Sequence, residues 1–252
     1  MGKVIVCYKW VLDEADIRIN ADLSVDFSRA KYKISDYDKN SIEAGSRAAK
    51  AMGAASVALS CGSAETRKSF ADALARGIDE GFWVNTGAAA VDGAQTGRMI
   101  AAAVNSIGDA VLLICSEGSS DEYARQTGAR VGALLDWPVI SSVTGFSIEG
   151  DLITAERKLE TCMQTVSAKL PVVLSVLPEV APAPIPGLKQ VMMAKKKAVV
   201  ERSAGELGVA LGGGETELCG YVSQRRKQIV TGDSTAELVS SLVEALKREG
   251  VV

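Results

Sequence analysis

Short apolar runs alternate with amphipathic, alanine-rich stretches through residues 1–145 of the chain. The apolar runs predict strands at residues 4–8, 55–60, 81–84, 110–115 and 139–142. Apolar positions at helical spacing predict helices at residues 38–52, 64–76, 93–107 and 121–135, the first of them ended by Gly53. Because strands and helices alternate one by one, the predicted fold class is α/β, a doubly wound parallel sheet.

The pattern changes after Gly145. Residues 146–167 predict a hairpin that turns at residues 149–151, and residues 172–176 predict one more strand. Residues 177–187 contain four of the six prolines, so we expect them to be extended and exposed. Beyond them, we expect residues 191–200 to continue outward and residues 205–214 to be a flexible linker.

A last helix is predicted at residues 234–249, with Leu238, Leu242, Val243 and Leu246 on one face. A helix at the end of a long linker can pack on a partner or fold back on its own domain, and the sequence alone leaves both open. The chain contains no internal repeat of fixed period.

Composition narrows the class of protein. The 252 residues are 47% hydrophobic, enough for a sizeable core, and 28 basic against 31 acidic residues give no overall basic field for nucleic acid. No apolar run reaches the ~20 residues that span a bilayer, so we expect no membrane span and a cytoplasmic location. The five cysteines are scattered and never form a CxxC pair, which indicates neither a disulfide framework nor a zinc site.

The chain contains no histidine. Ser–His and Cys–His nucleophiles, a histidine general base and HExxH metal sites are therefore all excluded. We expect any chemistry to belong mainly to a cofactor, and we predict no catalytic residue.

The connection after the strand at 110–115 is the most informative local feature. Gly118, Ser119, Ser120 and Asp121 separate this buried strand from the predicted helix. At the carboxyl end of a parallel strand, free backbone N–H groups and the dipole of the next helix favour an anion, so we predict a phosphate-bearing ligand here. The alternative is an ordinary connection in which the serines and the aspartate only cap the helix.

Five segments together resemble the beta subunit of an electron transfer flavoprotein. They are VIVCYKWV at 4–11, ISDYDKNSIEA at 34–44, LSCG at 59–62, RQTGARVGALLDWP at 125–138 and the PxPxPxLxxxMxAKKK arrangement at 182–197. Their order and spacing carry the resemblance from Met1 to about Gly208. The resemblance implies an adenine nucleotide alpha hydrolase-like fold, with a nucleotide-binding domain over 1–208 and a linker and C-terminal arm over 209–252.

The resemblance also implies a heterodimer with an alpha subunit that holds most of a shared FAD, and an electron carrier without catalytic activity of its own. This chain would bind an adenine nucleotide, either AMP or a second FAD, and AMP is the nucleotide we favour. The turn GSSDEYARQTG is similar to the branch associated with nitrogen fixation, carnitine or anaerobic acyl-CoA reduction. Near the partner's flavin, only Arg157 and Glu160 match the family's usual turn.

The matching nucleotide motifs supply the candidate binding residues. They are Cys7, Asp36, Tyr37, Asp38, Cys61, Gly62, Arg125, Gln126, Thr127 and Gly128, with Ser119, Ser120 and Asp121 completing the cradle or facing the partner's flavin. Three alternatives remain at this stage. In these alternatives, the two cysteines only fill space in the core, Asp38 is only the N-cap of its helix, and Arg125 is only a solvated surface charge.

The proline-rich segment at 177–197 matches the family's partner-recognition loop. Leu188, with Ile185 nearby, is the expected anchor for a redox partner such as an acyl-CoA dehydrogenase, unless Leu188 packs into its own domain. A second candidate function is an ATP-using enzyme of the adenine nucleotide hydrolase type, because residues 118–121 resemble an SGGxDS pyrophosphate loop. A third is a structural module with a vestigial pocket.

Overall fold

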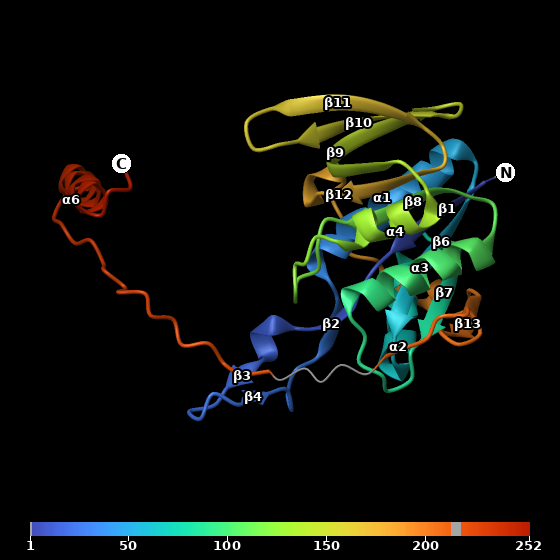
Figure 1. The fold of residues 1–252 in the computed structure, drawn as a ribbon, viewed down its shortest axis with the longest axis horizontal. Helices are drawn as coiled ribbons and strands as arrows, with labels where there is room; N and C mark the ends of the chain where they lie inside the picture. The colour runs from blue at the N-terminus through green and yellow to red at the C-terminus, as the bar shows by residue number, and fades with distance from the viewer. Residues whose placement is uncertain (1, 213–217) are drawn as a thin grey trace.

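The computed structural model describes residues 2–212 and 218–252, and a nine-stranded sheet forms its centre (Figure 1). The strands of this sheet are β1 Lys3–Cys7, β6 Ala55–Gly62, β7 Glu80–Asn85, β8 Ala110–Ser116, β9 Val139–Glu149, β10 Leu152–Lys158, β11 Met163–Lys169, β12 Val172–Val176 and β13 Val199–Ser203. Across the sheet they run in the order β11–β10–β9–β12–β8–β1–β6–β7–β13. All neighbours from β9 to β13 pair in parallel, whereas β10 and β11 are antiparallel.

Helices cover both faces of the sheet. The helices beside the sheet are α1 Asp36–Met52, α2 Ala64–Ala75, α3 Gly93–Ile107, α4 Thr127–Leu135 and α5 Leu188–Ala194, with short 3-10 turns η1 Glu14–Asp16 and η2 Pro178–Val180. The C-terminal helix α6 Thr235–Arg248 lies away from the sheet (Figure 1). Ile42 of α1 and Phe70 of α2 belong to one buried cluster, and Met99 of α3 and Val131 of α4 belong to the other. The predicted doubly wound α/β fold is therefore confirmed.

The order of the strands reverses at β1. From β1 the chain proceeds outward to β6 and β7, and then α3 carries it back to β8 on the other side of β1. In open α/β sheets, ligands bind outside the carboxyl ends of the strands at such a reversal. The carboxyl ends of β1 and β8 are therefore the expected place for a ligand.

The start of α1 corrects one prediction. The helix begins at Asp36 with Ser35 as its N-cap, so Asp38 is not the N-cap. Asp38 lies in the first turn of α1, where its side chain is buried. Before this helix lie two small sheets that the sequence did not reveal, because their strands are too short for a period-2 pattern to show. They pair β2 Trp10–Leu12 with β5 Tyr32–Ile34, and β3 Arg18–Ile19 with β4 Val25–Asp26.

The helix predicted at 121–135 begins only at Thr127. Residues 117–126 form a loop instead, in which Tyr123 and Arg125 have φ angles of 47° and 58°. These left-handed conformations cannot continue a right-handed helix. Glu117, which is buried, accepts a hydrogen bond from the Tyr123 hydroxyl at 3.0 Å and forms an ion pair with Arg125, so side-chain contacts hold the loop in this shape.

The strand predicted at 139–142 is longer than expected. β9 runs without interruption into the predicted hairpin, which turns at Gly150 as expected, and β11 extends the hairpin to a three-stranded antiparallel unit. This unit and the sheet's other strands are continuous in Figure 1, where β10 and β11 form the upper edge.

The segment after the prolines also differs from expectation. Residues 177–187 are largely without regular structure, as predicted, apart from η2 and the buried Ala181. Residues 191–200 do not continue outward, because α5 packs Ala194 into the core and β13 then pairs with β7. Of the linker predicted at 205–214, Gly213 and Gly214 lie outside the described residues.

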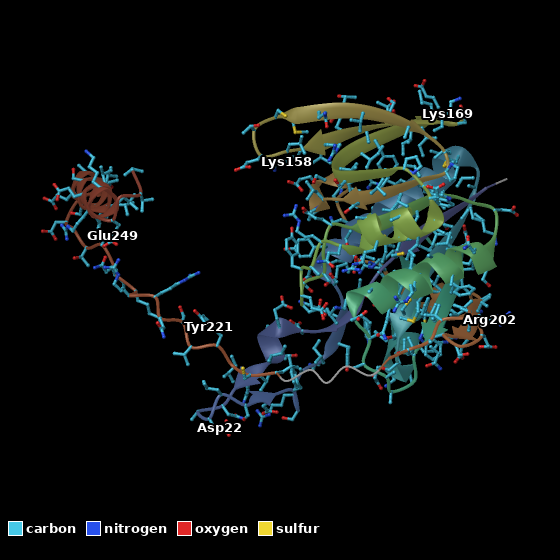
Figure 2. The ribbon with its side chains drawn as sticks, in the orientation of Figure 1. Asp22, Lys158, Lys169, Arg202, Tyr221 and Glu249 are labelled. Carbon is cyan, nitrogen blue, oxygen red and sulfur yellow. The ribbon has the colours of Figure 1, made fainter. Side chains whose placement is uncertain are left out.

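The C-terminal arm leaves the domain beside β3 and β4. Cys219 forms an isolated antiparallel β-bridge with Ser24, and the backbone amide of Gly220 donates a hydrogen bond to the Leu23 carbonyl at 2.7 Å. Beyond this point the arm runs away from the domain to α6, and the side chains of Tyr221 and Glu249 lie far from the sheet (Figures 1 and 2). No residue of α6 is buried, so the helix does not fold back on its own domain.

Candidate functional site

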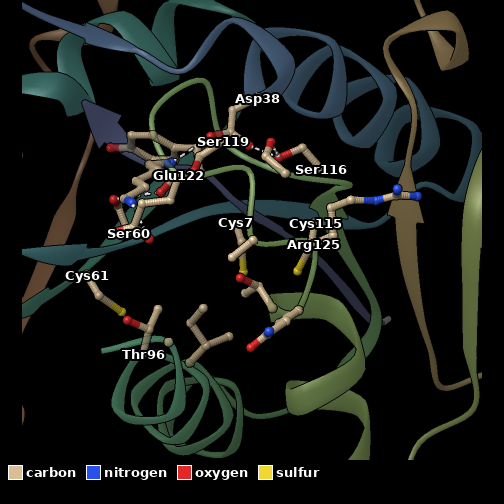
Figure 3. A pocket seen from close by; sticks show the side chains of 18 of the residues that line it. Cys7, Asp38, Ser60, Cys61, Thr96, Cys115, Ser116, Ser119, Glu122 and Arg125 are labelled. Atoms are coloured by element: carbon tan, nitrogen blue, oxygen red, sulfur yellow. Dashed lines mark hydrogen bonds and ion pairs between the residues drawn. The ribbon is translucent and has the colours of Figure 1, made fainter. Parts of the chain in front are cut away.

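A cavity of about 170 Å³ lies at the carboxyl ends of β1, β6 and β8, where the strand order reverses (Figure 3). The starts of α3 and α4 form its opposite side. The sequence-predicted residues that line it are Cys7, Asp38, Cys61, Ser119, Arg125, Gln126 and Thr127. Segments that are far apart in the sequence therefore meet in one hollow.

Three other predicted residues surround the cavity without lining it. Asp36 is exposed and pairs with two lysines of its own neighbourhood, Lys33 and Lys39. Tyr37 packs its ring against that of Tyr123, with 5.2 Å between ring centroids. Asp121 forms an ion pair at 2.7 Å with Lys9, which does line the cavity.

The two predicted glycines have packing roles in this structure. A Cβ on Gly62 would approach the Thr66 hydroxyl oxygen to 2.2 Å, and one on Gly128 would lie 3.2 Å from the Cβ of Ser175. Neither glycine lines the cavity. At Gly128, the absence of a side chain allows α4 to pack closely on the sheet. Ser120 also lies outside the lining. Its hydroxyl is buried and has no hydrogen-bond partner among the described residues.

Asp38 connects three elements at the cavity wall. The Lys9 amide at the end of β1 donates to its Oδ2 at 2.8 Å, and the Ser116 hydroxyl at the end of β8 donates to its Oδ1. Burial raises the pKa of this carboxyl to about 7, and the hydrogen bonds that it accepts only partly oppose the shift. Asp38 therefore exchanges a proton near neutral pH.

The start of α4 offers unpaired backbone donors. No side chain in the described part of the sequence caps this helix, and both its N-cap Gln126 and its first residue Thr127 line the cavity. The start of α3, by contrast, is closed by a capping box between Asp92 and Gln95. The first N–H groups of a helix and its dipole attract anions, so α4 rather than α3 is suited to a phosphate.

Both cations at the cavity already have acidic partners. Arg125 pairs with Glu117 and lies 5.9 Å from the ring centroid of Tyr123. Lys9 pairs with Asp121 and, at 3.3 Å, with Glu122. An anion in the cavity would therefore compete with these carboxylates for Lys9 and Arg125. The first backbone N–H groups of α4 are donors for which no side chain of the described residues competes.

The cysteines form the floor of the cavity. Cys7 and Cys115 lie on neighbouring strands, and Cys61 lies across from them at the end of β6 (Figure 3). A hydrogen bond to Cys115 and burial raise the pKa of Cys7, and burial raises the pKa of Cys61 to about 12. The protonated thiols of Cys7 and Cys61 therefore act as small cavity-filling groups, not as nucleophiles.

Several lining residues escaped the sequence analysis: Lys9, Ser60, Asp92, Thr96 and Ser116. For two of them, the sequence contains a recognisable signal. Asp92 begins an Asp-x-x-Gln capping box, and Ser116 is the polar residue that directly ends the strand predicted at 110–115. Lys9, Ser60 and Thr96 had none, because only the folded sheet brings them to the cavity.

The predicted partner anchors lie elsewhere on the molecule. Leu188 begins α5 and is 80% exposed, and Ile185 before it is 93% exposed. Leu188 therefore does not pack into its own domain. Within residues 2–212 and 218–252, no three cysteine, aspartate or glutamate side chains cluster as a metal site would require, and no helix is long and apolar enough to cross a bilayer.

One comparison with known proteins assigns the chain to a family. A family model described as the electron transfer flavoprotein domain matches residues 22–207. The match covers well over half of the chain and contains the central strands β6, β8 and β12 as well as α1 and α4. The chain therefore belongs to the electron transfer flavoprotein family.

Proposed function

We propose that this chain is the beta-type subunit of an electron transfer flavoprotein heterodimer and that its cavity binds an adenine nucleotide. Proteins of this family are electron carriers, which supports the general role. The observation that carries the nucleotide proposal is the position of the cavity, at the reversal of strand order and against the uncapped start of α4. Adenine nucleotides bind at this place in open α/β sheets.

The residues present suit such a ligand. The α4 amides and the Thr127 hydroxyl, which line the cavity, can donate to phosphate oxygens. Leu59 and Ile100 give the cavity an apolar wall against which a ribose or a base can pack. The volume of about 170 Å³ is below the ~300–1,000 Å³ usual for small-molecule pockets. A nucleotide would therefore fill the cavity and displace the loop at 117–126.

AMP is the nucleotide we propose, with a second FAD as the alternative. A flavin, when bound, supplies one- and two-electron transfer. In either case, the residues of this chain bind and orient the nucleotide. Ile185 and Leu188 would dock a redox partner such as an acyl-CoA dehydrogenase, in keeping with their exposure beside three rigid prolines.

The test is to purify the chain alone and with a candidate alpha subunit, denature both samples and identify the released nucleotides by chromatography and mass. One AMP per chain and one FAD per heterodimer would support the proposal as stated. Two FAD per heterodimer would replace AMP by a second flavin, and no nucleotide in either sample would refute binding. ATP hydrolysis by the same samples would instead favour the ATP-using enzyme.

A further inference from the structure

The segment of residues 181–197, here called the docking segment, is tied to the main domain by side chains from two helices and by one of its own lysines. Asn40 of α1 donates from Nδ2 to the Ala181 carbonyl at 2.7 Å. Arg76, the C-cap of α2, donates from Nη1 to the Pro184 carbonyl at 3.2 Å. At the other end, Lys197 donates from Nζ to the carbonyls of Leu74 and Ile78 at 3.0 and 2.5 Å.

Such contacts matter because the segment has few other means to fix its shape. Prolines at 182, 184 and 186 have no N–H group, so this stretch cannot build a ladder of backbone hydrogen bonds. The contacts from Asn40 and Arg76 meet the chain just before the exposed side chains of Ile185 and Leu188. They therefore set the direction in which these two apolar groups leave the domain.

Arg76 is itself held in place. Its side chain is only 9% exposed, and its Nη2 pairs with Asp72 at 3.2 Å one helical turn earlier. An arginine on a mobile surface would remain solvated, whereas this one gives up hydration to contact the carbonyl of an exposed proline. The contact orders the segment more than it stabilises the core.

We infer that Arg76 and Asn40 are positioning residues for partner docking, an inference that rests on the docking role proposed above. They hold the segment in its binding shape before the partner arrives, so less conformational entropy is lost on association. The exposed face combines apolar Leu188, Met192 and Met193 with Lys189, Lys195 and Lys196. The occupant it fits is a redox partner protein with an apolar pocket and an acidic rim.

The first measurement concerns the chain alone and does not depend on a partner. In Arg76→Gln, we expect the backbone amides of Ile185 and of residues 187–190 to exchange with deuterium about twofold to tenfold faster, the loss that corresponds to one hydrogen bond. Arg67→Gln is the matched control. Arg67 lies on α2, is exposed and makes no side-chain hydrogen bond within the described residues, so exchange should not change. Unchanged exchange in Arg76→Gln would overturn the inference.

The second measurement is electron transfer to a purified acyl-CoA dehydrogenase by the complete heterodimer. Arg76→Gln should raise the KM for this partner about twofold to tenfold, with kcat and bound nucleotide unchanged, and the effect should vanish in a Leu188→Ala background. If exchange rises and Leu188→Ala weakens docking while Arg76→Gln does not, the positioning role is wrong. If Leu188→Ala itself changes nothing, the proposed docking function is wrong.

Discussion

Asp38 is the residue whose protonation most directly affects the cavity. Its pKa is raised by burial from an ordinary 3.8 to about 7, so the folded chain keeps a proton that the unfolded chain releases above about pH 4. Stability must therefore fall as pH rises between these two values, by at most about 1.4 kcal/mol per pH unit, and stop changing above about pH 7. An anion in the cavity favours the protonated carboxyl.

This linkage gives a prediction for Asp38→Asn. The amide can still accept from the Lys9 N–H and can donate to the Ser116 hydroxyl, so the variant should fold. As the pH rises from about 6 to about 8, we expect the affinity of the native chain for AMP to fall severalfold more than that of the variant. Calorimetry measures both affinities. The comparison removes the titration of the phosphate itself. Parallel pH profiles for the two proteins would contradict the assignment.

The cysteines differ in their expected reactivity. Cys162 and Cys219 are exposed, whereas Cys7 and Cys115 are buried and the pKa of Cys7 is raised. With iodoacetamide at about pH 8, we expect Cys162 and Cys219 to react rapidly and the cavity thiols slowly, and AMP should slow Cys61 further. Mass spectrometry of the alkylated peptides measures each rate. Fast alkylation of Cys7 or Cys115 in the folded chain would rule out a cavity floor of buried, unreactive thiols.

At the scale of elements, the loop at 117–126 carries local backbone strain. Arg125 has a φ of 58°, a conformation that costs a residue with a side chain about 1–2 kcal/mol. We therefore expect Arg125→Gly to be more stable than Arg125→Ala by about 1 kcal/mol in urea unfolding.

Ala133, exposed within α4, provides the control for that comparison. Ala133→Gly should lose stability by up to about 1 kcal/mol, because glycine is unfavourable in a helix. Equal stability of the two Arg125 variants would mean that the left-handed conformation is not maintained in solution.

The sequence predicted the elements whose burial is continuous. Strands at 55–60 and 110–115 and the helix at 93–107 were found because long apolar patterns identify them. The edge strand β13 and α5 were missed, since three lysines between them resemble a solvated surface. Only the fold shows that Lys197 donates its ammonium protons to carbonyls of the α2 region.

The site was predictable only in part, for a related reason. Cys7 ends β1 and Cys61 lies next to the end of β6, two strands with clear apolar patterns, so their convergence on one edge of the sheet could be expected. The start of α4 depends on two left-handed residues that no periodicity reveals. Ser120 and Asp121, expected to complete the cradle or to face the partner's flavin, are not among the residues that line the cavity.

At the scale of the whole molecule, the C-terminal arm contributes little to the stability of the domain. No residue of α6 is buried, and the last contacts with the body are those of Cys219 and Gly220 with the hairpin at 18–26. We expect removal of residues 222–252 to change the Tm by less than about 2 °C in calorimetry. The same truncation should weaken binding to the alpha subunit, and a large drop in Tm would show that the arm packs on its own domain.

We propose that an adenine nucleotide occupies the cavity at the carboxyl ends of β1, β6 and β8, against the starts of α3 and α4. The most direct measurement is calorimetric titration of AMP into the nucleotide-free native chain and two variants of α3. Thr96→Trp would fill the cavity, whereas Asn105→Trp places the same side chain on an exposed position. We predict one AMP bound per native chain and per Asn105→Trp chain, and none by Thr96→Trp. Undiminished binding by a folded Thr96→Trp chain would place the nucleotide elsewhere and rule out this cavity as its site.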